Sequence, residues 1–534
     1  MKNIAKAAGV FFTAAVLAAC SGGNGGGPGS SGQGTGASPD KFVDGGTFTT
    51  SMSADPGNLD PQLSASSILN QLSAFAYDSL VATAKDGSIV SQLAKTWKVD
   101  GKSVTMTLND GITCSDGSPF TADDAAANIN FMSNPANKSA FVGLYVPAGA
   151  KASAKGSDLT IQLAAPSPFV LQGLSSAPMV CKAGLADRTK LEKQTLGTGP
   201  FQLSEVVPSD HITYTKRPGY TWGPGGATTA EKGMPATVTV KVVASTTTAA
   251  NLLLSGGLNA ATITGQDAAR MEGAKLFATQ EDAVAGENWF NQAAGRPNSD
   301  PAVRKALTQA LNFDQLRDVF TAKQGTAPTT FAVIPPAPCP GKSVAGNLPS
   351  GGLDAAKATL DAAGWTAGSD GTRSKGGQSL TLTFVYNTTY GPEGAAAGEL
   401  ASAAWKQLGA KVAMTGQDST AQLNTLFTTG NWDIAWLTLN VSTPDQLVPF
   451  LSGASPQNNF SHIKNADYEA KIAEAAKLPG KDGCETWLAA ETNLVKAADV
   501  FPFANLPVRT FGKNAQFASG SQAVVPTTIR MLAN

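Results

Sequence analysis

The chain has 534 residues, of which 42% are hydrophobic and 15% charged, and its formal net charge at pH 7 is −1. A nucleic-acid-binding protein would show a basic stripe, so this near balance argues against a nucleic-acid partner. More than 500 residues are too many for one simple core, and the length therefore predicts two or three lobes.

The N-terminal residues predict export. Two lysines precede an apolar run over residues 7–17. This run has the length of a signal-peptide core and is shorter than the roughly 20 residues of a membrane-spanning helix. Small residues then lead to Cys20, and the segment Leu-Ala-Ala-Cys resembles the lipobox of bacterial lipoproteins. We expect a signal peptide over residues 1–19 and lipidation at Cys20. A plain cleaved signal followed by an unrelated cysteine is the alternative.

Residues 20–40 continue as a glycine-rich and serine-rich segment without large apolar side chains. Such a segment cannot bury surface, so we expect a flexible tether. No later run reaches 18 consecutive apolar residues, and we expect no membrane-spanning helix there. The protein would be exported and held by its lipid anchor at the outer face of the cytoplasmic membrane, at the cell surface or in the periplasm.

Periodic apolar residues predict alternating strands and helices. In chain order, strands are expected at 104–108, 159–163, 238–242 and 380–385, the first of them closing a hairpin through Asp100 and Gly101. Helices are expected after a capping box at Thr121 and Asp124, from a first turn with Pro301, from Asp354 to Gly364, and over 395–408. Because strands and helices interleave, the fold class is α/β.

Four cysteines follow Cys20, at 114, 181, 339 and 484, and four cysteines allow three disulfide pairings. We favour Cys114 with Cys181 and Cys339 with Cys484, because each pair then stays within one expected lobe. The chain has only two histidines and no Cys-x-x-Cys spacing, so we predict neither a metal site nor a cofactor.

Catalytic motifs are missing or incomplete. The sequence contains neither Gly-x-Ser-x-Gly nor His-Glu-x-x-His. Residues 461–464 match Ser-x-x-Lys, but the companion motifs of that enzyme class are absent. Residues 340–343 lack the glycine-rich start of a phosphate loop. His211 lies in an alternating stretch and is expected on a surface strand. We predict that the protein is not an enzyme, with an exported hydrolase as an alternative.

A series of motifs spans nearly the whole chain, at residues 58–61, 77–81, 94–98, 111–124, 197–201, 218–224, 254–259, 299–314, 361–365 and 431–435. In order and spacing they resemble the family-5 extracellular solute-binding proteins of ABC importers, the oligopeptide, dipeptide and nickel group. Two positions depart from the family pattern. Cys114 stands where an aromatic residue is usual, and the acidic pair of the 254–259 motif is lost.

The resemblance implies an α/β, two-lobed periplasmic-binding-protein-like fold of type II, cluster C, with an extra subdomain on lobe I. The implied boundaries are 41–82, 198–282 and 503–534 for lobe I, 83–197 for the subdomain and 283–502 for lobe II. A ligand would bind between the lobes and favour the closed state. The protein, a monomer, would then deliver the ligand to a membrane permease, and a separate cytoplasmic subunit would hydrolyse ATP.

Motif position and the preference of ligands for strand ends give the expected ligand contacts. They are Ser64, Ser66, Ser67, Tyr386, Asn387, Tyr390, Trp436, Asn440, Ser442, Asp445 and Asn505. Their amides, hydroxyls and aromatic rings suit a peptide backbone or sugar hydroxyls equally. By contrast, Trp97, Trp365 and Trp405 are expected to pack in cores.

The nature of the ligand depends on one departure from the family. Peptide binders of this family commonly carry an aspartate after the strand equivalent to 431–435, where it pairs with the peptide's amino terminus. Here no acidic residue follows that strand until Asp445. Either Asp445 takes that role or the ligand lacks a free amine, because a buried ammonium without a partner is costly.

We therefore expect a substrate-binding lipoprotein that captures an oligopeptide for an ABC importer. One alternative is the same role for an oligosaccharide or a metal chelate. Another is a surface protein that binds other proteins as a sensor or chaperone without transport. Bare nickel is disfavoured, because histidines are scarce and the thiols are expected in disulfides.

Overall fold

The computed structural model describes residues 41–64, 66–453, 459–520 and 523–533. The expected signal peptide, Cys20 and the tether lie outside these residues. Within the described parts of the chain, no helix is long and apolar enough to cross a bilayer. Strands and helices interleave along the chain, as the sequence patterns predict.

Lobe I is built on a four-stranded sheet in the order β1-β10-β9-β8. Its strands are β1 (Thr47–Met52), β8 (Phe201–Val207), β9 (His211–Lys216) and β10 (Thr237–Val242). β1 runs parallel to β10, and the other neighbours are antiparallel. Helix α1 (Ser67–Ala76) packs on this sheet, where Phe75 of the helix contacts Tyr214 of β9 with ring centroids 5.5 Å apart.

The other elements of lobe I lie before the lobe crossing and at the C-terminal end. They are α5 (Thr246–Ser255), β11 (Ala260–Ile263), α6 (Gln266–Gly273), β20 (Ala515–Gln516), β21 (Ser519–Gly520), β22 (Ala523–Val524) and β23 (Arg530–Met531). α5, β11 and α6 share a small apolar core with Phe511.

A subdomain lies between α1 and β8 in the sequence and has its own antiparallel sheet, in the order β4-β5-β7-β6. Its elements are β2 (Val81–Thr83), β3 (Ile89–Ser91), β4 (Ala94–Asp100), β5 (Ser103–Leu108), α2 (Ala122–Met132), β6 (Lys151–Lys155), β7 (Asp158–Gln162), α3 (Val170–Leu174) and α4 (Lys182–Ala186). The alternating Val104, Met106 and Leu108 are all buried, so β5 turns one face to the subdomain core.

Lobe II contains most of a six-stranded sheet in the order β11-β19-β12-β18-β16-β17. Its strands are β12 (Phe277–Phe290), β16 (Thr381–Asn387), β17 (Lys411–Gln417), β18 (Ile434–Trp436) and β19 (Val500–Gly512), with a small sheet of β13 (Thr366–Ala367), β14 (Arg373–Lys375) and β15 (Gln378–Ser379). Its helices are α7 (Pro301–Gln309), α8 (Phe313–Phe320), α9 (Gly352–Ala362), α10 (Gly391–Gln407), α11 (Ser419–Asn424), α12 (Val448–Leu451), α13 (Ala466–Ala475) and α14 (Cys484–Lys496).

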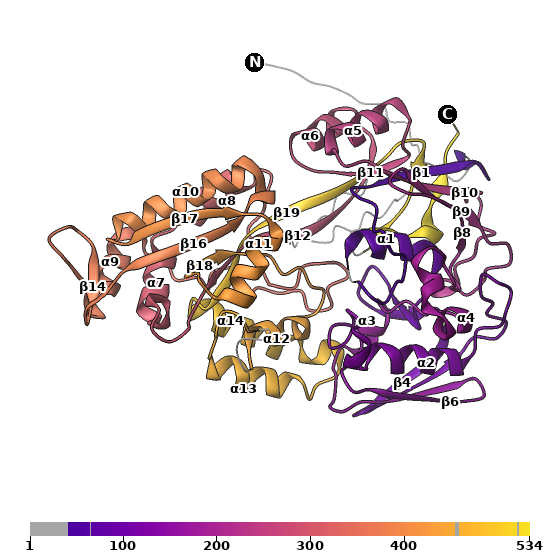
Figure 1. The fold of residues 1–534 in the computed structure, drawn as a ribbon, viewed down its shortest axis with the longest axis horizontal. Helices are drawn as coiled ribbons and strands as arrows, with labels where there is room; N and C mark the ends of the chain where they lie inside the picture. The colour runs from indigo at the N-terminus through magenta and orange to yellow at the C-terminus, as the bar shows by residue number, and fades with distance from the viewer. Residues whose placement is uncertain (1–40, 65, 454–458, 521–522, 534) are drawn as a thin grey trace, which may run out of the picture. The chain divides into compact units, whose positions relative to one another are not determined.

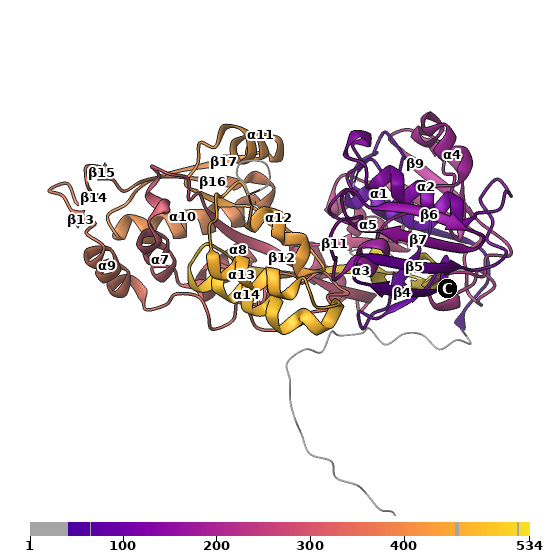
Figure 2. The same ribbon diagram turned by 90° about the horizontal axis from the view of Figure 1, so that it is seen from below.

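The two long strands β12 and β19 carry the chain between the lobes. They pair antiparallel from Phe277 and Gly512 in lobe I to Trp289 and Val500 in lobe II. Figure 1 shows them side by side, running from β11 into the sheet of lobe II, and Figure 2 shows β12 at the same crossing. The register of β12 shifts at Gly286, where a Cβ atom would collide with the Phe503 ring. Glycine is therefore required at this point of the crossing.

The predicted elements are found, with two helices starting earlier than expected. α9 begins at Gly352, before Asp354, and α10 begins at Gly391, because Pro392 fits the first helical turn. Both helices end where the sequence indicates, since Gly364 and Gly409 adopt positive φ values of 84° and 87°.

Side-chain predictions for the structural residues are largely confirmed. Thr121 and Asp124 form the capping box of α2. Trp365 and Trp405 are buried in the lobe II core, whereas Trp97 is half-buried against the subdomain core. His211 lies on β9, with its ring 2.8 Å from the neighbouring Asp210 carboxylate.

Two disulfides link distant parts of the chain. Cys114 pairs with Cys181 inside the subdomain, and Cys339 pairs with Cys484 inside lobe II. The first holds the turn after β5 to the start of α4. The second holds a loop of lobe II to the first residue of α14. These are the two pairings favoured from the sequence.

Candidate functional site

A small pocket lies in lobe I where β1 and β10 end beside the crossing strands. It has a volume of about 250 Å³. It is lined by Ser51, Met52, Ser53, Ser67, Ile68, Gln71, Val243, Ala244, Thr246, Ala249, Thr262 and Val508. These residues come from the ends of two strands, the first turns of α1 and α5, and both β11 and β19. None of the lining residues is charged.

One wall of this pocket is the outer edge of β1. β1 is the edge strand of its sheet, and Asn259 covers the first half of its outer edge. The Thr49 N–H donates to Asn259 Oδ1, and the backbone N–H of Asn259 donates to the Thr49 C=O. Alternation along a strand directs the N–H and C=O of Ser51 to the same edge. The Ser51 carbonyl accepts a long bond of 3.4 Å from Gln71 Nε2. The edge beside Ser51–Ser53 therefore faces the pocket.

The predicted residues at the start of α1 organise this wall. Ser66 is the N-cap of α1 and accepts from the Leu69 N–H at 3.3 Å. Ser64 Oγ in turn accepts from the Ser66 N–H at 3.2 Å. Ser67 is the first residue of the helix and lines the pocket directly. Of the three predicted serines, Ser67 is thus the one at the pocket surface, and the other two shape the turn before it.

In lobe II, the segment after β18 is fixed to the crossing strand β12. Trp289 Nε1 donates to the Leu437 C=O at 2.7 Å, and the Leu439 N–H donates to the Glu287 carboxylate at 2.9 Å. Asn440 bonds both backbone groups of Val284, at 2.8 and 3.0 Å. The predicted Asn440 is therefore a structural link between the segment after β18 and β12.

Glu287 is a buried carboxyl on the crossing strand, with 2% of its surface exposed. Burial raises the pKa of Glu287 to about 8, and the bond from the Leu439 N–H opposes this only in part. The carboxyl is therefore largely protonated at neutral pH. No sequence pattern pointed to Glu287, because a single acid in an apolar strand has no periodic signature.

The predicted aromatic residues of lobe II meet around Phe320 of α8. Tyr390 and Trp436 lie 5.2 and 5.6 Å from the Phe320 ring centroid. Burial raises the pKa of Tyr390 to about 12 and its hydroxyl interacts with Thr438. Trp436 is buried and donates Nε1 to the Asn288 side chain at 3.1 Å. Tyr386, on β16, is half-buried beside the same cluster.

Three further predicted residues are engaged within the protein. Asn387 is buried and donates Nδ2 to Ser419 Oγ and Gln422 Oε1. The Ser442 N–H donates to Gln446 Oε1 at 3.1 Å. Asn505 pairs through its backbone with Thr326. The Oδ1 atom of Asn505 is buried and has no hydrogen-bond partner among the described residues.

Asp445 lines a second, larger pocket of about 570 Å³ between the subdomain and lobe II. Its lining comprises Pro166, Ser167, Pro168, Asp445, Val448, Ser452, Gly453, Glu469, Ile472, Ala473, Ala476 and Trp487. Thr443 Oγ1 donates to the Asp445 carboxylate at 2.5 Å. Burial raises the pKa of Asp445 to about 6, so the carboxylate is mainly ionised at pH 7.

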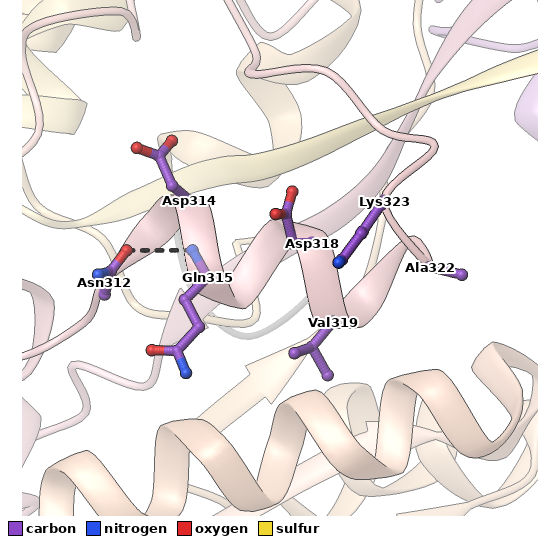
Figure 3. A pocket seen from close by; sticks show the side chains of 7 residues that line it. All are labelled: Asn312, Asp314, Gln315, Asp318, Val319, Ala322 and Lys323. Atoms are coloured by element: carbon purple, nitrogen blue, oxygen red, sulfur yellow. Dashed lines mark hydrogen bonds between the residues drawn. The ribbon is translucent and has the colours of Figure 1, made fainter.

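A third depression, of about 700 Å³, lies on α8 of lobe II (Figure 3). It is lined by Asn312, Asp314, Gln315, Asp318, Val319, Ala322 and Lys323. Figure 3 shows these side chains pointing in different directions from the N-cap of α8, the helix itself and the turn after it. The bond from the Gln315 N–H to Asn312 Oδ1 caps the helix. Because the side chains do not converge, we assign no ligand to this surface.

Neither the open edge of β1 nor the walls of the pocket that contains Asp445 were predicted from the sequence. Ser51 and Met52 are the last residues of β1 and Ser53 follows it, so the rule that ligands bind at strand ends could have found them. Pro166–Pro168 and Trp487 lie more than 300 residues apart and offered no such signal. Among the described residues, no group of three histidine, cysteine, aspartate or glutamate side chains could hold a metal ion.

A family model described as bacterial extracellular solute-binding proteins, family 5, matches residues 88–461, more than half of the chain. The chain is a family 5 solute-binding protein. Members of this family are transport proteins and not enzymes, and this chain is accordingly a substrate-binding protein of an ABC importer. Family 5 members are exported binding proteins.

Relatives of this family 5 protein bear different names. It is 28% identical over 403 residues to the nickel-binding periplasmic protein of Escherichia coli K12, covering 72% of each chain. It is 27% identical over 287 residues to the glutathione-binding protein GsiB of Escherichia coli O157:H7, covering 52% of this chain and 54% of GsiB.

Solved structures show the same two-lobed fold. The oligopeptide-binding protein AppA of Bacillus subtilis, in complex with a nonapeptide, matches with a TM-score of 0.71 and 18% identity over 92% of this chain and all of AppA. NikA of Brucella suis, in complex with Fe(III)-EDTA, matches with a TM-score of 0.74 and 20% identity over 91% of this chain and all of NikA.

Proposed function

We propose that this protein captures an oligopeptide between its two lobes and delivers it to the permease of an ABC importer. The observation that carries the proposal is the edge of β1 at Ser51–Ser53, which faces an uncharged pocket beside the crossing strands. An exposed strand edge pairs with an extended peptide backbone through main-chain hydrogen bonds, whatever the side chains of the peptide.

We also propose the lobe boundaries that the sequence predicts. Lobe I would comprise 41–82, 198–282 and 503–534, the subdomain 83–197 and lobe II 283–502. Ligand contacts from Ser67, Tyr386, Tyr390 and the segment after β18 would then join the lobes, so that the bound peptide favours the closed state.

A metal chelate is the second candidate ligand. The nickel-binding name of one relative and the Fe(III)-EDTA complex of one structural neighbour favour it. Such a ligand would not need a carboxylate for a free amine, and the segment after β18 carries none before Asp445.

We also propose that the protein is a lipoprotein anchored at Cys20. The lipobox-like segment and the tether support this proposal. Cys20→Ala should abolish incorporation of labelled fatty acid and release the protein from the membrane fraction. Labelled fatty acid on the Cys20→Ala protein, or its absence from the wild type, would exclude acylation of this cysteine.

Native mass spectrometry of the protein, purified from rich medium without refolding, tests the ligand class. Bound masses that differ by amino-acid residue masses would support the oligopeptide proposal. Bound masses spaced by hexose units or matching a metal chelate would exclude it. If the protein retains no ligand, titration calorimetry with a random library of tripeptides to pentapeptides tests the proposal. Saturable heat of binding supports the oligopeptide proposal, and its absence contradicts it.

A further inference from the structure

The pocket that contains Asp445 lies between the subdomain and lobe II. The subdomain contributes Pro166–Pro168, and lobe II contributes residues of α12, α13 and α14. At about 570 Å³ it lies within the usual volume range of small-molecule sites. The smaller pocket beside β1 shares no residue with it.

Direct contacts hold the two walls of this pocket together. The Gly480 N–H donates to the Pro168 C=O at 2.9 Å, and Lys481 Nζ donates to the Asp86 C=O at 3.1 Å. Beneath the pocket, Phe169 packs against Trp487 with ring centroids 6.2 Å apart. These two rings form a separate buried cluster with Cys339 and Ala475. The Cys339–Cys484 disulfide fixes the lobe II side of this cluster.

The pocket combines apolar walls with negative charge. Val448, Ile472 and Trp487 offer aliphatic and aromatic surface, together with the two prolines of the subdomain loop. The charged residues of the lining are Asp445 and Glu469, both acidic. Asp445 lies deeper, held by Thr443, and Glu469 is exposed on the first turn of α13.

This combination selects a particular chemical group. A carboxylate in an apolar pocket attracts a cation, because its own hydration is incomplete. An aliphatic stem would fill the apolar walls while its ammonium group reaches the carboxylates, as a lysine side chain does along protein surfaces. The indole of Trp487 is buried and forms part of the apolar wall beside this stem.

We infer that the pocket between Pro166–Pro168 and α12–α14 is a second binding site, which accepts an ammonium group on an aliphatic stem, with Asp445 as its counter-ion and Glu469 at the entrance. The group would belong to a free diamine or to the lysine side chain of a bound peptide. In the second case the inference deepens the proposed function and rests on it. Because both walls contribute, an occupied pocket stabilises the contact between subdomain and lobe II.

The probe for the test is 1,5-diaminopentane, with 1-pentanol as an uncharged control of similar length. Titration calorimetry gives the affinity, and the indole N–H resonance of Trp487, assigned with Trp487→Phe, gives the location. We expect saturable diamine binding that shifts this resonance, and no such shift with 1-pentanol. Asp445→Asn should weaken the binding about tenfold or more, and Glu469→Gln should weaken it less.

Two further variants make the result decisive. Ala473→Trp fills the pocket from an exposed position on α13 and should abolish diamine binding without disturbing a core. Asp467→Asn removes an exposed charge from the same helix outside the lining and should leave the affinity unchanged. Diamine binding that is absent, or that survives Asp445→Asn and Ala473→Trp unchanged, would overturn the inference.

A third arm separates this inference from the proposed function. Lysine-containing peptides should bind more tightly than their norleucine counterparts if the group is supplied by a peptide, and equally if the source is a free diamine. Peptide binding without diamine binding at Trp487 overturns the inference alone. Diamine binding in a protein that retains and binds no peptide overturns the oligopeptide proposal alone.

Discussion

The side chain of Asn440 takes the place of a strand beside Val284. Its Oδ1 accepts from the Val284 N–H at 2.8 Å, and its Nδ2 donates to the Val284 C=O at 3.0 Å. β18 pairs with β12 only at Asn288–Phe290, so the backbone at Val284 has no strand on this side. One amide thereby couples the segment after β18 to the strand that crosses between the lobes.

Asn440→Leu should destabilise the protein by about 1–3 kcal/mol, because it removes two partly buried hydrogen bonds to the backbone of Val284. Urea unfolding followed by circular dichroism measures the change. Asn440→Asp keeps the bond from the Val284 N–H and loses the bond to the Val284 C=O. Its free energy of unfolding should therefore lie between the values of the wild type and Asn440→Leu. Equal stability of all three proteins would show that water replaces the side chain.

Glu287→Gln should change how stability depends on pH. The folded-state pKa of Glu287, about 8, is above its ordinary value of 4.5, so the folded protein takes up a proton. The stability that protonated Glu287 contributes to the folded wild-type protein is fully present below pH 4.5 and is lost as the pH rises through 8. As the pH rises from 5 to 8, the free energy of unfolding of the variant should increase by about 3 kcal/mol relative to that of the wild type. Glu485→Gln, at an exposed position, is the control and should show no such gain.

Removal of either disulfide should be strongly destabilising. The bonds close segments with sequence separations of 67 and 145 residues. The chain-entropy argument gives about 4 kcal/mol for the first and about 5 kcal/mol for the second. Thermal unfolding of the Cys114→Ala/Cys181→Ala and Cys339→Ala/Cys484→Ala proteins measures the losses. A larger loss for the shorter segment would contradict the entropic account.

Ser51→Pro tests the strand edge of the proposed peptide site. Proline removes the Ser51 N–H, which faces the pocket edge and not β10, so the β1–β10 ladder should persist. We expect peptide affinity to fall about fivefold to tenfold, the equivalent of one hydrogen bond. Ser51→Ala keeps the N–H and should bind as wild type does. Unchanged affinity in Ser51→Pro would exclude main-chain pairing at this edge.

Local patterns in the sequence determined the elements and the family. The alternation at Val104, Met106 and Leu108 and the capping box at Thr121 depend on neighbouring residues alone, so the sequence predicts β5 and the start of α2. The favoured disulfide pairs followed from the expected lobes, and those lobes came from a series of motifs spaced along nearly the whole chain.

The tertiary structure decided which predicted ligand contacts are free to meet a ligand. Asn440 and Asn387 are chemically suited to a ligand, but their amides bond the protein's own strands and helices. Glu287 and the pocket of Asp445 and Trp487 have no local signature, because their partners come from distant segments. A sequence pattern records which residues are polar or apolar, whereas burial and hydrogen bonding between distant segments determine what each polar group still has available.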